Sequence, residues 1–139
     1  MSTITYILDS NPTTEDDKIL RDGIVNFNRE VVKEKATHFS IFAKDSNNII
    51  GGALVWEHSD ALYLDVLWCD ENNRKHGIGS KIIQMIQSYA RNKNLPKIFV
   101  DTFDFQSEAF YLKHGFYRIG VIPQYLLEHD RIYLRKDIF

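Results

Sequence analysis

Residues 67–80 read Leu-Trp-Cys-Asp-Glu-Asn-Asn-Arg-Lys-His-Gly-Ile-Gly-Ser, and this is the most informative stretch of the sequence. It starts at the end of an apolar run over 61–69 and finishes where a helical pattern begins. It therefore predicts a strand, a polar loop and a helix, with Arg74-x-x-Gly77-x-Gly79 in the loop. Free N–H groups at a helix N-terminus attract anions, and glycine lets a phosphate approach the main chain. The stretch predicts a phosphate-binding loop, although an ordinary glycine-rich helix start fits it equally well.

Two other phosphate-binding motifs fit this stretch less well. A Walker loop needs Gly-Lys-Ser or Gly-Lys-Thr, but Gly79 is followed by Ser80 and then Lys81. A dinucleotide fingerprint needs a third glycine at the position of Ile82. The loop is therefore of a different kind.

The periodicity of apolar residues divides the rest of the chain into regular elements, with no repeat or low-complexity segment between them. Before the loop we expect a strand over 3–8, one or two helices between 13 and 36, and strands over 39–43, 49–56 and 61–69. After it we expect a helix over 78–93, a strand over 97–103, a helix over 107–114, and strands over 116–122 and 131–135. This order predicts an α/β (α+β) fold, whose mixed, mostly antiparallel central sheet carries helices on both faces. The length of 139 residues fits one domain over 1–139.

The composition of the chain argues against several classes of function. The net charge is −2 and no block of basic residues occurs, so we expect no nucleic-acid partner. No apolar run approaches the ~20 residues that span a bilayer, and the N-terminus lacks the basic segment of a secretory signal. These features, with a single cysteine at Cys69, favour a cytoplasmic protein without membrane attachment.

Two motifs and the order of elements resemble one known superfamily. Arg74-x-x-Gly77-x-Gly79 resembles the Q/R-x-x-G-x-G/A signature of the Gcn5-related N-acetyltransferases (GNAT). Residues 110–116, Phe-Tyr-Leu-Lys-His-Gly-Phe, are similar to that superfamily's L-Y-x-K-x-G-F segment. The predicted elements from 3 to 136 follow the GNAT order. The resemblance therefore covers nearly the whole chain.

The resemblance implies a site for acetyl-coenzyme A (acetyl-CoA) as co-substrate. The glycine loop would hold the pyrophosphate, and a bulge in the strand before it would turn backbone amides toward the pantetheine arm and the thioester. The residues so implied are Leu67, Trp68, Cys69, Arg74, Lys75, His76, Gly77, Ile78, Gly79 and Ser80. The five histidines show no metal-ligand spacing, so we expect no metal.

Tyr111 is the candidate general acid, because a phenol has a pKa of about 10 and holds a proton at neutral pH. The alternative is a tyrosine that only packs on a helix face. Many members of the superfamily have an asparagine seven residues before this tyrosine, where this chain has Asp104. We do not carry that cofactor contact over, because an anionic side chain does not favour a phosphate.

Asp65 is the first candidate base, acting directly or through water. It lies among apolar residues of a predicted strand, where a carboxylate is costly unless it has a partner or a function. Strict alternation places it on the same face as Tyr63 and Leu67. A hydrogen bond to a neighbouring strand is the structural alternative. Glu57 and Asp101 are weaker candidates for the same role.

We therefore expect an acetyl-CoA-dependent N-acyltransferase that acetylates a small-molecule amine by direct attack in a ternary complex. Acidic residues near the strand ends would bind the amine as a cation; they are Glu57, Asp60, Asp101, Asp104 and Glu108. A non-catalytic acyl-CoA sensor and a protein N-acetyltransferase are the alternatives. The sequence does not identify the acceptor or decide between a monomer and a homodimer.

Overall fold

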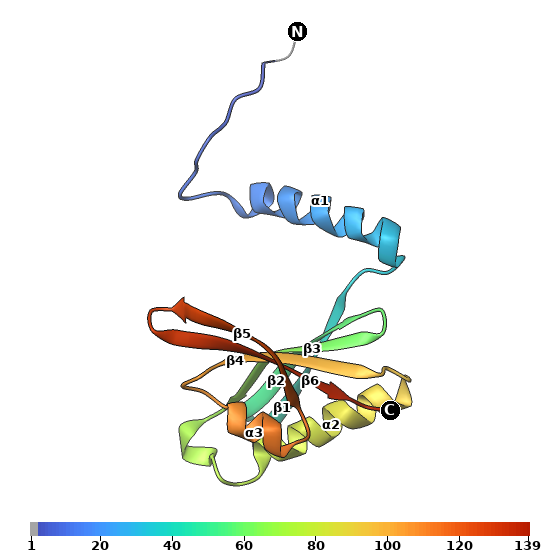
Figure 1. Ribbon diagram of the computed structural model, residues 1–139, viewed down its shortest axis with the longest axis vertical. Helices are drawn as coiled ribbons and strands as arrows, with labels where there is room; N and C mark the ends of the chain where they lie inside the picture. The colour runs from blue at the N-terminus through green and yellow to red at the C-terminus, as the bar shows by residue number, and fades with distance from the viewer. Residues whose placement is uncertain (1–2) are drawn as a thin grey trace. The chain divides into compact units, whose positions relative to one another are not determined.

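The computed structural model describes residues 3–139. The chain forms two compact units, one ending at Lys35 and one running from Ala36 to Phe139, and each is described by itself. Figure 1 labels the helices and strands of both. The expectation of one domain over 1–139 stays a prediction.

The first unit contains one helix, α1 (Thr14–Val32). The Thr13 hydroxyl oxygen accepts a hydrogen bond from the Asp16 amide at 3.2 Å and caps the helix N-terminus. The helix ends where Lys33 adopts a left-handed conformation, with φ of 69°. No residue of α1 is buried, although Leu20, Ile24 and Phe27 form an apolar stripe along it.

The predicted strand over 3–8 was wrong. These residues are not in any strand, and Ile4, Tyr6 and Leu8 are between 74% and 92% exposed. Their alternation fits a half-buried strand, but a strand also needs a neighbour for its N–H and C=O groups. Within residues 3–139 this segment pairs with no strand.

The second unit is built on a sheet of six strands in the order β1-β2-β3-β4-β6-β5. All neighbours are antiparallel except β3 and β4, so the predicted mixed, mostly antiparallel sheet is confirmed. The strands are β1 (Thr37–Asp45), β2 (Asn48–His58), β3 (Ala61–Cys69), β4 (Lys97–Phe103), β5 (Tyr117–Leu126) and β6 (His129–Asp137). The last two are longer than predicted, because their hairpin extends pairing to Leu126 and His129.

Helices α2 (Ile78–Asn92) and α3 (Glu108–Lys113) lie on the same side of the sheet (Figure 1). The buried stripe of α2, which includes Ile82, Ile83 and Ile86, belongs to the same core as the inward side chains of the strands. Tyr111 of α3 lies in that core as well. No helix within residues 3–139 combines the length and the apolarity needed to cross a membrane.

The pairing of β3 with β4 is short. It consists of four residue pairs, from Ala61 opposite Lys97 to Leu64 opposite Val100, and we call these pairs the β3–β4 seam. Both strands continue past the seam without pairing to each other, β3 to Cys69 and β4 to Phe103. The sheet is therefore split open at this end.

A bulge in β3 lies directly after the seam. Leu54 of β2 is opposite Val66, but the next residue of β2 is opposite Leu64, so Asp65 is the extra residue. The expectation that Tyr63 and Leu67 share a face with Asp65 was wrong, because the bulge interrupts the alternation. Leu67 lies on the face of Leu64, opposite to that of Tyr63.

Candidate functional site

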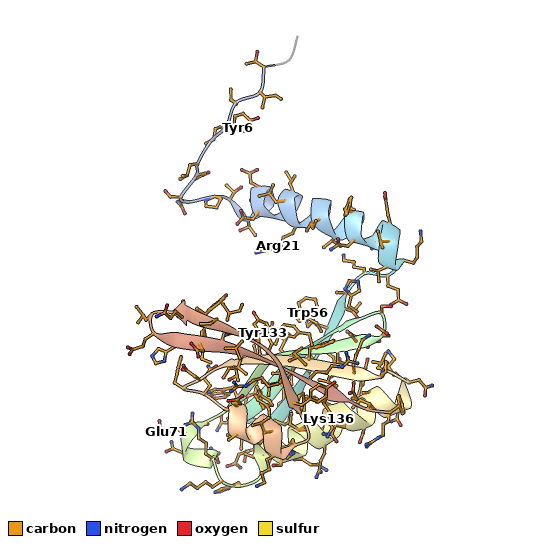
Figure 2. All side chains as sticks on the ribbon, viewed as in Figure 1. Tyr6, Arg21, Trp56, Glu71, Tyr133 and Lys136 are labelled. Atoms are coloured by element: carbon orange, nitrogen blue, oxygen red, sulfur yellow. The ribbon has the colours of Figure 1, made fainter. Side chains whose placement is uncertain are left out.

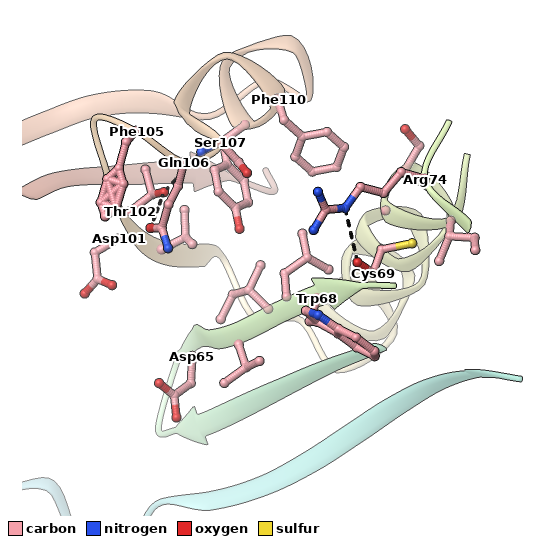
Figure 3. Close-up of a pocket in the computed structure, with 18 of the residues that line it drawn as sticks. Asp65, Trp68, Cys69, Arg74, Asp101, Thr102, Phe105, Gln106, Ser107 and Phe110 are labelled. Carbon is pink, nitrogen blue, oxygen red and sulfur yellow. Dashed lines mark hydrogen bonds between the residues drawn. The ribbon is translucent and has the colours of Figure 1, made fainter. Parts of the chain in front are cut away.

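A cavity of about 830 Å³ opens where β3 and β4 separate. Its walls come from the far end of β3, the loop and first turn of α2, the end of β4 and the start of α3 (Figure 3). The predicted site residues that line it are Asp65, Leu67, Trp68, Cys69, Arg74, Lys75, Gly77, Ile78, Gly79, Ser80 and Tyr111. His76 was also expected there, but it is exposed and does not line the cavity. The fold thus brings two distant sequence motifs into one site.

The first turn of α2 presents unpaired backbone donors to this cavity. Gly77 is the N-cap residue, has a φ of 74°, and supplies no side-chain cap. The first α2 amide that bonds back to the loop is that of Lys81, which donates to Gly77 O at 3.0 Å. The preceding N–H groups, from Ile78 to Ser80, therefore have no helical acceptor, and the positive end of the helix dipole lies behind them. This geometry suits an anion.

Gly79 lines the cavity, and its predicted contact with the pyrophosphate stays a prediction, but its backbone also has a packing role. It lies within α2 with ordinary helical geometry, so it is not needed for an unusual backbone angle. A Cβ atom at this position would lie 3.1 Å from Cζ of Phe110 on α3. Gly79 therefore allows α3 to approach α2 closely. A Cβ at Gly77, in contrast, would meet nothing within 4 Å.

The loop before α2 is held by its own hydrogen bonds. Arg74 Nε donates to Cys69 O at 3.3 Å, which ties the loop to the end of β3 (Figure 3). The Asp70 amide donates to Ile50 O at 2.7 Å, and the Asn73 side-chain amide donates to the Asp70 carboxylate at 3.0 Å. The loop is thus fixed at several points, and the Arg74 guanidinium stands at the cavity wall.

A side-chain pair also joins the first turn of α2 to the end of α3. Ser80 Oγ and His114 Nε2 are 3.0 Å apart, and Lys136 Nζ donates to His114 O at 2.6 Å. Burial, followed by the charges of Lys113 and Lys136, lowers the pKa of His114. The imidazole is therefore neutral at ordinary pH and can either donate to or accept from Ser80.

Tyr111 is enclosed by aromatic rings. It is 5% exposed, and its ring makes edge-on contacts with Phe110 and Phe116 at centroid distances of 5.4 and 5.5 Å. Within residues 3–139 its hydroxyl has no hydrogen-bond partner, and the residue lines the cavity. Burial, with a smaller contribution from the charge of Asp101, raises the pKa of Tyr111 to about 12. The hydroxyl thus stays protonated and is available to a bound molecule.

Asp65 and Asp101 are the two carboxylates of the cavity wall, and their surroundings differ. Asp65 is exposed and accepts a hydrogen bond from Trp56 Nε1 at 3.4 Å. No cation of residues 3–139 forms an ion pair with it. Asp101, in contrast, accepts from Tyr63 Oη at 3.0 Å and from Arg131 Nη2 at 2.6 Å. The Asp101 carboxylate therefore already has a cationic partner, whereas the Asp65 carboxylate has none within residues 3–139.

The other acidic residues that were expected to bind a cation are engaged as well. Each of these carboxylates already has a basic partner. The pairs are Glu57 with Lys93 at 3.2 Å, Asp60 with Lys97 at 3.0 Å, Asp104 with His129 at 2.9 Å and Glu108 with Arg118 at 2.7 Å. None of the four lines the cavity. The structure therefore gives no support to the expectation that these four residues bind the acceptor, which stays a prediction.

Several cavity residues were missed in the sequence. Gln106 holds the loop after β4, because its side-chain oxygen accepts from the Phe103 amide at 2.8 Å and from Thr102 Oγ1 at 3.1 Å. Arg131 reaches the cavity because β6 places it opposite Phe103, the last residue of β4. Only the strand register reveals this placement. Among these residues, only Thr102 could have been noticed in the sequence, because it is a polar residue in an apolar strand.

A family model described as the acetyltransferase (GNAT) family matches residues 4–116. The chain belongs to this family. Its relatives include the acetyltransferase Atu2258 of Agrobacterium fabrum, which is 26% identical over 84% of this chain and 87% of that protein. The blasticidin-S acetyltransferase of Streptomyces morookaense is 30% identical over 63% of this chain and 65% of that protein.

Solved structures of GNAT proteins agree with the fold. An acetyltransferase from Bacillus cereus is 27% identical and superimposes with a TM-score of 0.80 over 94% of this chain and 97% of that chain. A Bacillus anthracis protein described as a streptothricin acetyltransferase, in complex with acetyl-CoA, superimposes with a TM-score of 0.65. It is 23% identical over 72% of this chain and 62% of that chain, so it supports the fold alone. GNAT enzymes use acetyl-CoA, and acetyl transfer is the activity that family membership supports.

Proposed function

We propose that this GNAT protein transfers the acetyl group of acetyl-CoA to the amine nitrogen of a small molecule, by direct attack in a ternary complex. One observation carries the proposal: the glycine loop, the open end of β3 and Tyr111 all line a single cavity. A pyrophosphate site, a row of backbone amides and a proton-bearing hydroxyl are thus available to one bound acetyl-CoA.

The pyrophosphate belongs at the first turn of α2. The open N–H groups of 78–80 supply donors, and Arg74 and Lys75 supply positive charge beside them. The empty space around Gly77 lets a phosphate reach the main chain. From there the pantetheine arm would run along β3. Past the seam this strand pairs only with β2, so every second amide of the stretch is turned toward the split in the sheet. Such amides would polarise the thioester carbonyl.

Acetyl transfer itself needs a neutral amine. In our proposal Asp65 binds the ammonium form and takes its proton, directly or through water. The nitrogen then attacks the thioester carbon, so that the N–C bond forms and the C–S bond breaks. The sulfur leaves as a thiolate, and the nitrogen, which is positively charged after its attack, loses a second proton to water, so that the products are a neutral amide and the thiolate. Asp65 is suited to this role because it lies at the cavity wall without a basic partner in residues 3–139.

Tyr111 stabilises the departing sulfur in this scheme. Its pKa of about 12 keeps it protonated at every pH of interest. A thiol has a pKa of about 8.5, so complete proton transfer from Tyr111 to the thiolate would run uphill. We therefore propose that Tyr111 donates a hydrogen bond to the developing thiolate. This role is narrower than that of the general acid expected from the sequence.

Release of free coenzyme A from acetyl-CoA, measured across a panel of amines and matched alcohols, tests the proposal. We expect release only with amines, and a mass increase of one acetyl group on the amine. Binding of acetyl-CoA without release from any acceptor would favour the non-catalytic sensor. Faster release with basic peptides than with small amines would favour a protein acceptor.

A further inference from the structure

Arg131 is a positive charge that the proposed reaction does not use. Its guanidinium lines the cavity together with Asp65 and Asp101. Lys75 and Arg74, the other cations of the cavity wall, lie at the glycine loop, where the pyrophosphate is placed. Arg131 is on β6, beside the end of β4. A simple cationic amine gains nothing from it and would be repelled.

The Arg131 guanidinium is held in a fixed position. Its plane lies over the Phe103 ring, 4.3 Å from the ring centroid, and Tyr125 is 5.6 Å away. Nη2 donates to Asp101 Oδ1 at 2.6 Å, and Tyr63 donates to the other oxygen of that carboxylate. Arginine carries five N–H donors in a rigid plane, so donors remain for a second anion. The side chain is 22% exposed, which leaves it open to a ligand in the cavity.

The two charges at this end of the cavity have opposite signs and different surroundings. Asp65 has no basic partner within residues 3–139, so it can bind an ammonium group. Arg131 is anchored through one edge and can bind a carboxylate through its free donors. A molecule with both groups would satisfy both residues. A plain amine would leave the second charge without a ligand.

We infer that the acceptor is an amino acid or a similar small amine that also carries a carboxylate, with its ammonium at Asp65 and its carboxylate at Arg131. This inference rests on the proposed function, because it names the acceptor of the same site. It replaces the earlier set of acidic residues, all of which except Asp101 lie outside the cavity.

Pairs of acceptors that differ only in the carboxylate test the inference. Each amino acid of an α-, β- and ω-amino acid panel is compared with its primary carboxamide, and kcat/KM is obtained from coenzyme A release. A hydrogen bond to a charged group contributes about 1.5–3 kcal/mol, so we expect at least a tenfold preference for one or more acids. In Arg131→Gln the ratio of kcat/KM for each acid to kcat/KM for its carboxamide should fall toward one. Equal or better use of every carboxamide by the wild type would overturn the inference.

The matched control is Arg118→Gln, which also removes an arginine from an ion pair but lies outside the cavity. It should keep the wild-type ratio. Arg131→Lys retains the charge without the planar pair of donors, and should show an intermediate ratio. Unchanged acetyl-CoA binding in each variant shows that the site is folded.

Binding of the reaction products separates this inference from the proposed function. An N-acetyl amino acid keeps the carboxylate but has lost the ammonium, so its binding depends on Arg131 and not on turnover. We expect it to raise the melting temperature more than its carboxamide does, in the wild type but not in Arg131→Gln. If no amine is turned over and this difference persists, only the proposed chemistry fails. If amines are turned over and the difference is absent, only the carboxylate assignment fails.

Discussion

Asp104 and His129 join the end of β4 to the tip of the β5–β6 hairpin. Asp104 Oδ1 lies 2.9 Å from His129 Nδ1, and Asp104 Oδ2 accepts from the Asp130 amide at 2.9 Å. The same hairpin carries Arg131, which lines the cavity, and Tyr125, whose ring centroid lies 5.6 Å from the Arg131 guanidinium. The position that holds a cofactor-binding asparagine in many GNAT proteins therefore holds a structural carboxylate here.

The Asp104 contacts predict a pH-dependent stability. The Asp130 amide, and then His129, lower the pKa of Asp104 below its ordinary 3.8. A group whose pKa is lower in the folded state stabilises the protein above its ordinary pKa, and this stabilisation is lost as pH falls through the folded value. Asp104→Ala should therefore be less stable than wild type in urea at about pH 7, and the difference should shrink below about pH 4. Asp45→Ala, an exposed change outside the cavity, should show no such trend.

Substitution of Gly77 tests the pyrophosphate site. Gly77→Ala adds only strain, about 1–2 kcal/mol for a left-handed residue, since its Cβ meets no neighbour. Gly77→Glu adds a carboxylate beside the open N–H groups. We expect acetyl-CoA to raise the melting temperature of wild type and Gly77→Ala, but not of Gly77→Glu. Gly120→Glu on β5 is the control, because a Cβ there also meets no neighbour. Acetyl-CoA should still raise the melting temperature of this variant. Wild-type affinity in Gly77→Glu would place the pyrophosphate elsewhere.

Substitution of Tyr111 separates catalysis from packing. Tyr111→Phe keeps both ring contacts and removes only the hydroxyl, which has no partner within residues 3–139. We expect kcat to fall by about ten- to a hundredfold, because a hydrogen bond to a charged atom stabilises the transition state by a free energy that corresponds to such a factor. The affinity for acetyl-CoA should be unchanged. Tyr117→Phe, a change at an exposed tyrosine outside the cavity, is the control for loss of a phenol. An unaltered kcat would leave Tyr111 as a core residue.

The pH dependence of the rate gives a second test of Tyr111. Because burial raises its pKa to about 12, no fall in kcat near pH 10 should arise from this group. If the wild type loses activity with an apparent pKa of about 10, and Tyr111→Phe does not, then Tyr111 titrates normally in the complex. That result would contradict its enclosed position.

Asp65 is tested by the acidic side of the same profile. The amine must lose a proton before attack, so Asp65→Asn should shift the rise of kcat/KM toward higher pH and lower its plateau about tenfold or more. Asp60→Asn is the matched control, because its carboxylate pairs with Lys97 outside the cavity. Coincident profiles for wild type and Asp65→Asn would return Asp65 to its hydrogen bond with Trp56.

Sequence periodicity was sufficient for most elements but not for their pairing. The segment 3–8 alternates as regularly as β1 does, yet only β1 has a neighbouring strand. Alternation also failed at Asp65, because a bulge is defined by the opposite strand and leaves no local mark. Both errors concern contacts between segments, which a pattern within one segment does not contain.

The glycine loop could be found from sequence because all its parts are adjacent in the chain. The end of the cavity that contains Asp101 and Arg131 could not be found in this way. Asp101 and Arg131 are separated by a helix and a strand, and they meet only because β4 and β6 pair in one particular register. The choice between open and paired carboxylates likewise depends on partners from other strands.

The short β3–β4 seam divides the sheet into two three-stranded halves, joined by four residue pairs and the helices that lie over them. Amide hydrogens report such a division directly, since they exchange with deuterated water fastest where the fewest contacts must open. We therefore expect amides between Asp65 and Cys69, and the first-turn amides of α2, to exchange faster than those of β2 or β6 in the free protein. Bound acetyl-CoA, which in our proposal contacts both halves of the sheet, should slow the exchange of these same amides and so connect the two halves where no strand pairing does.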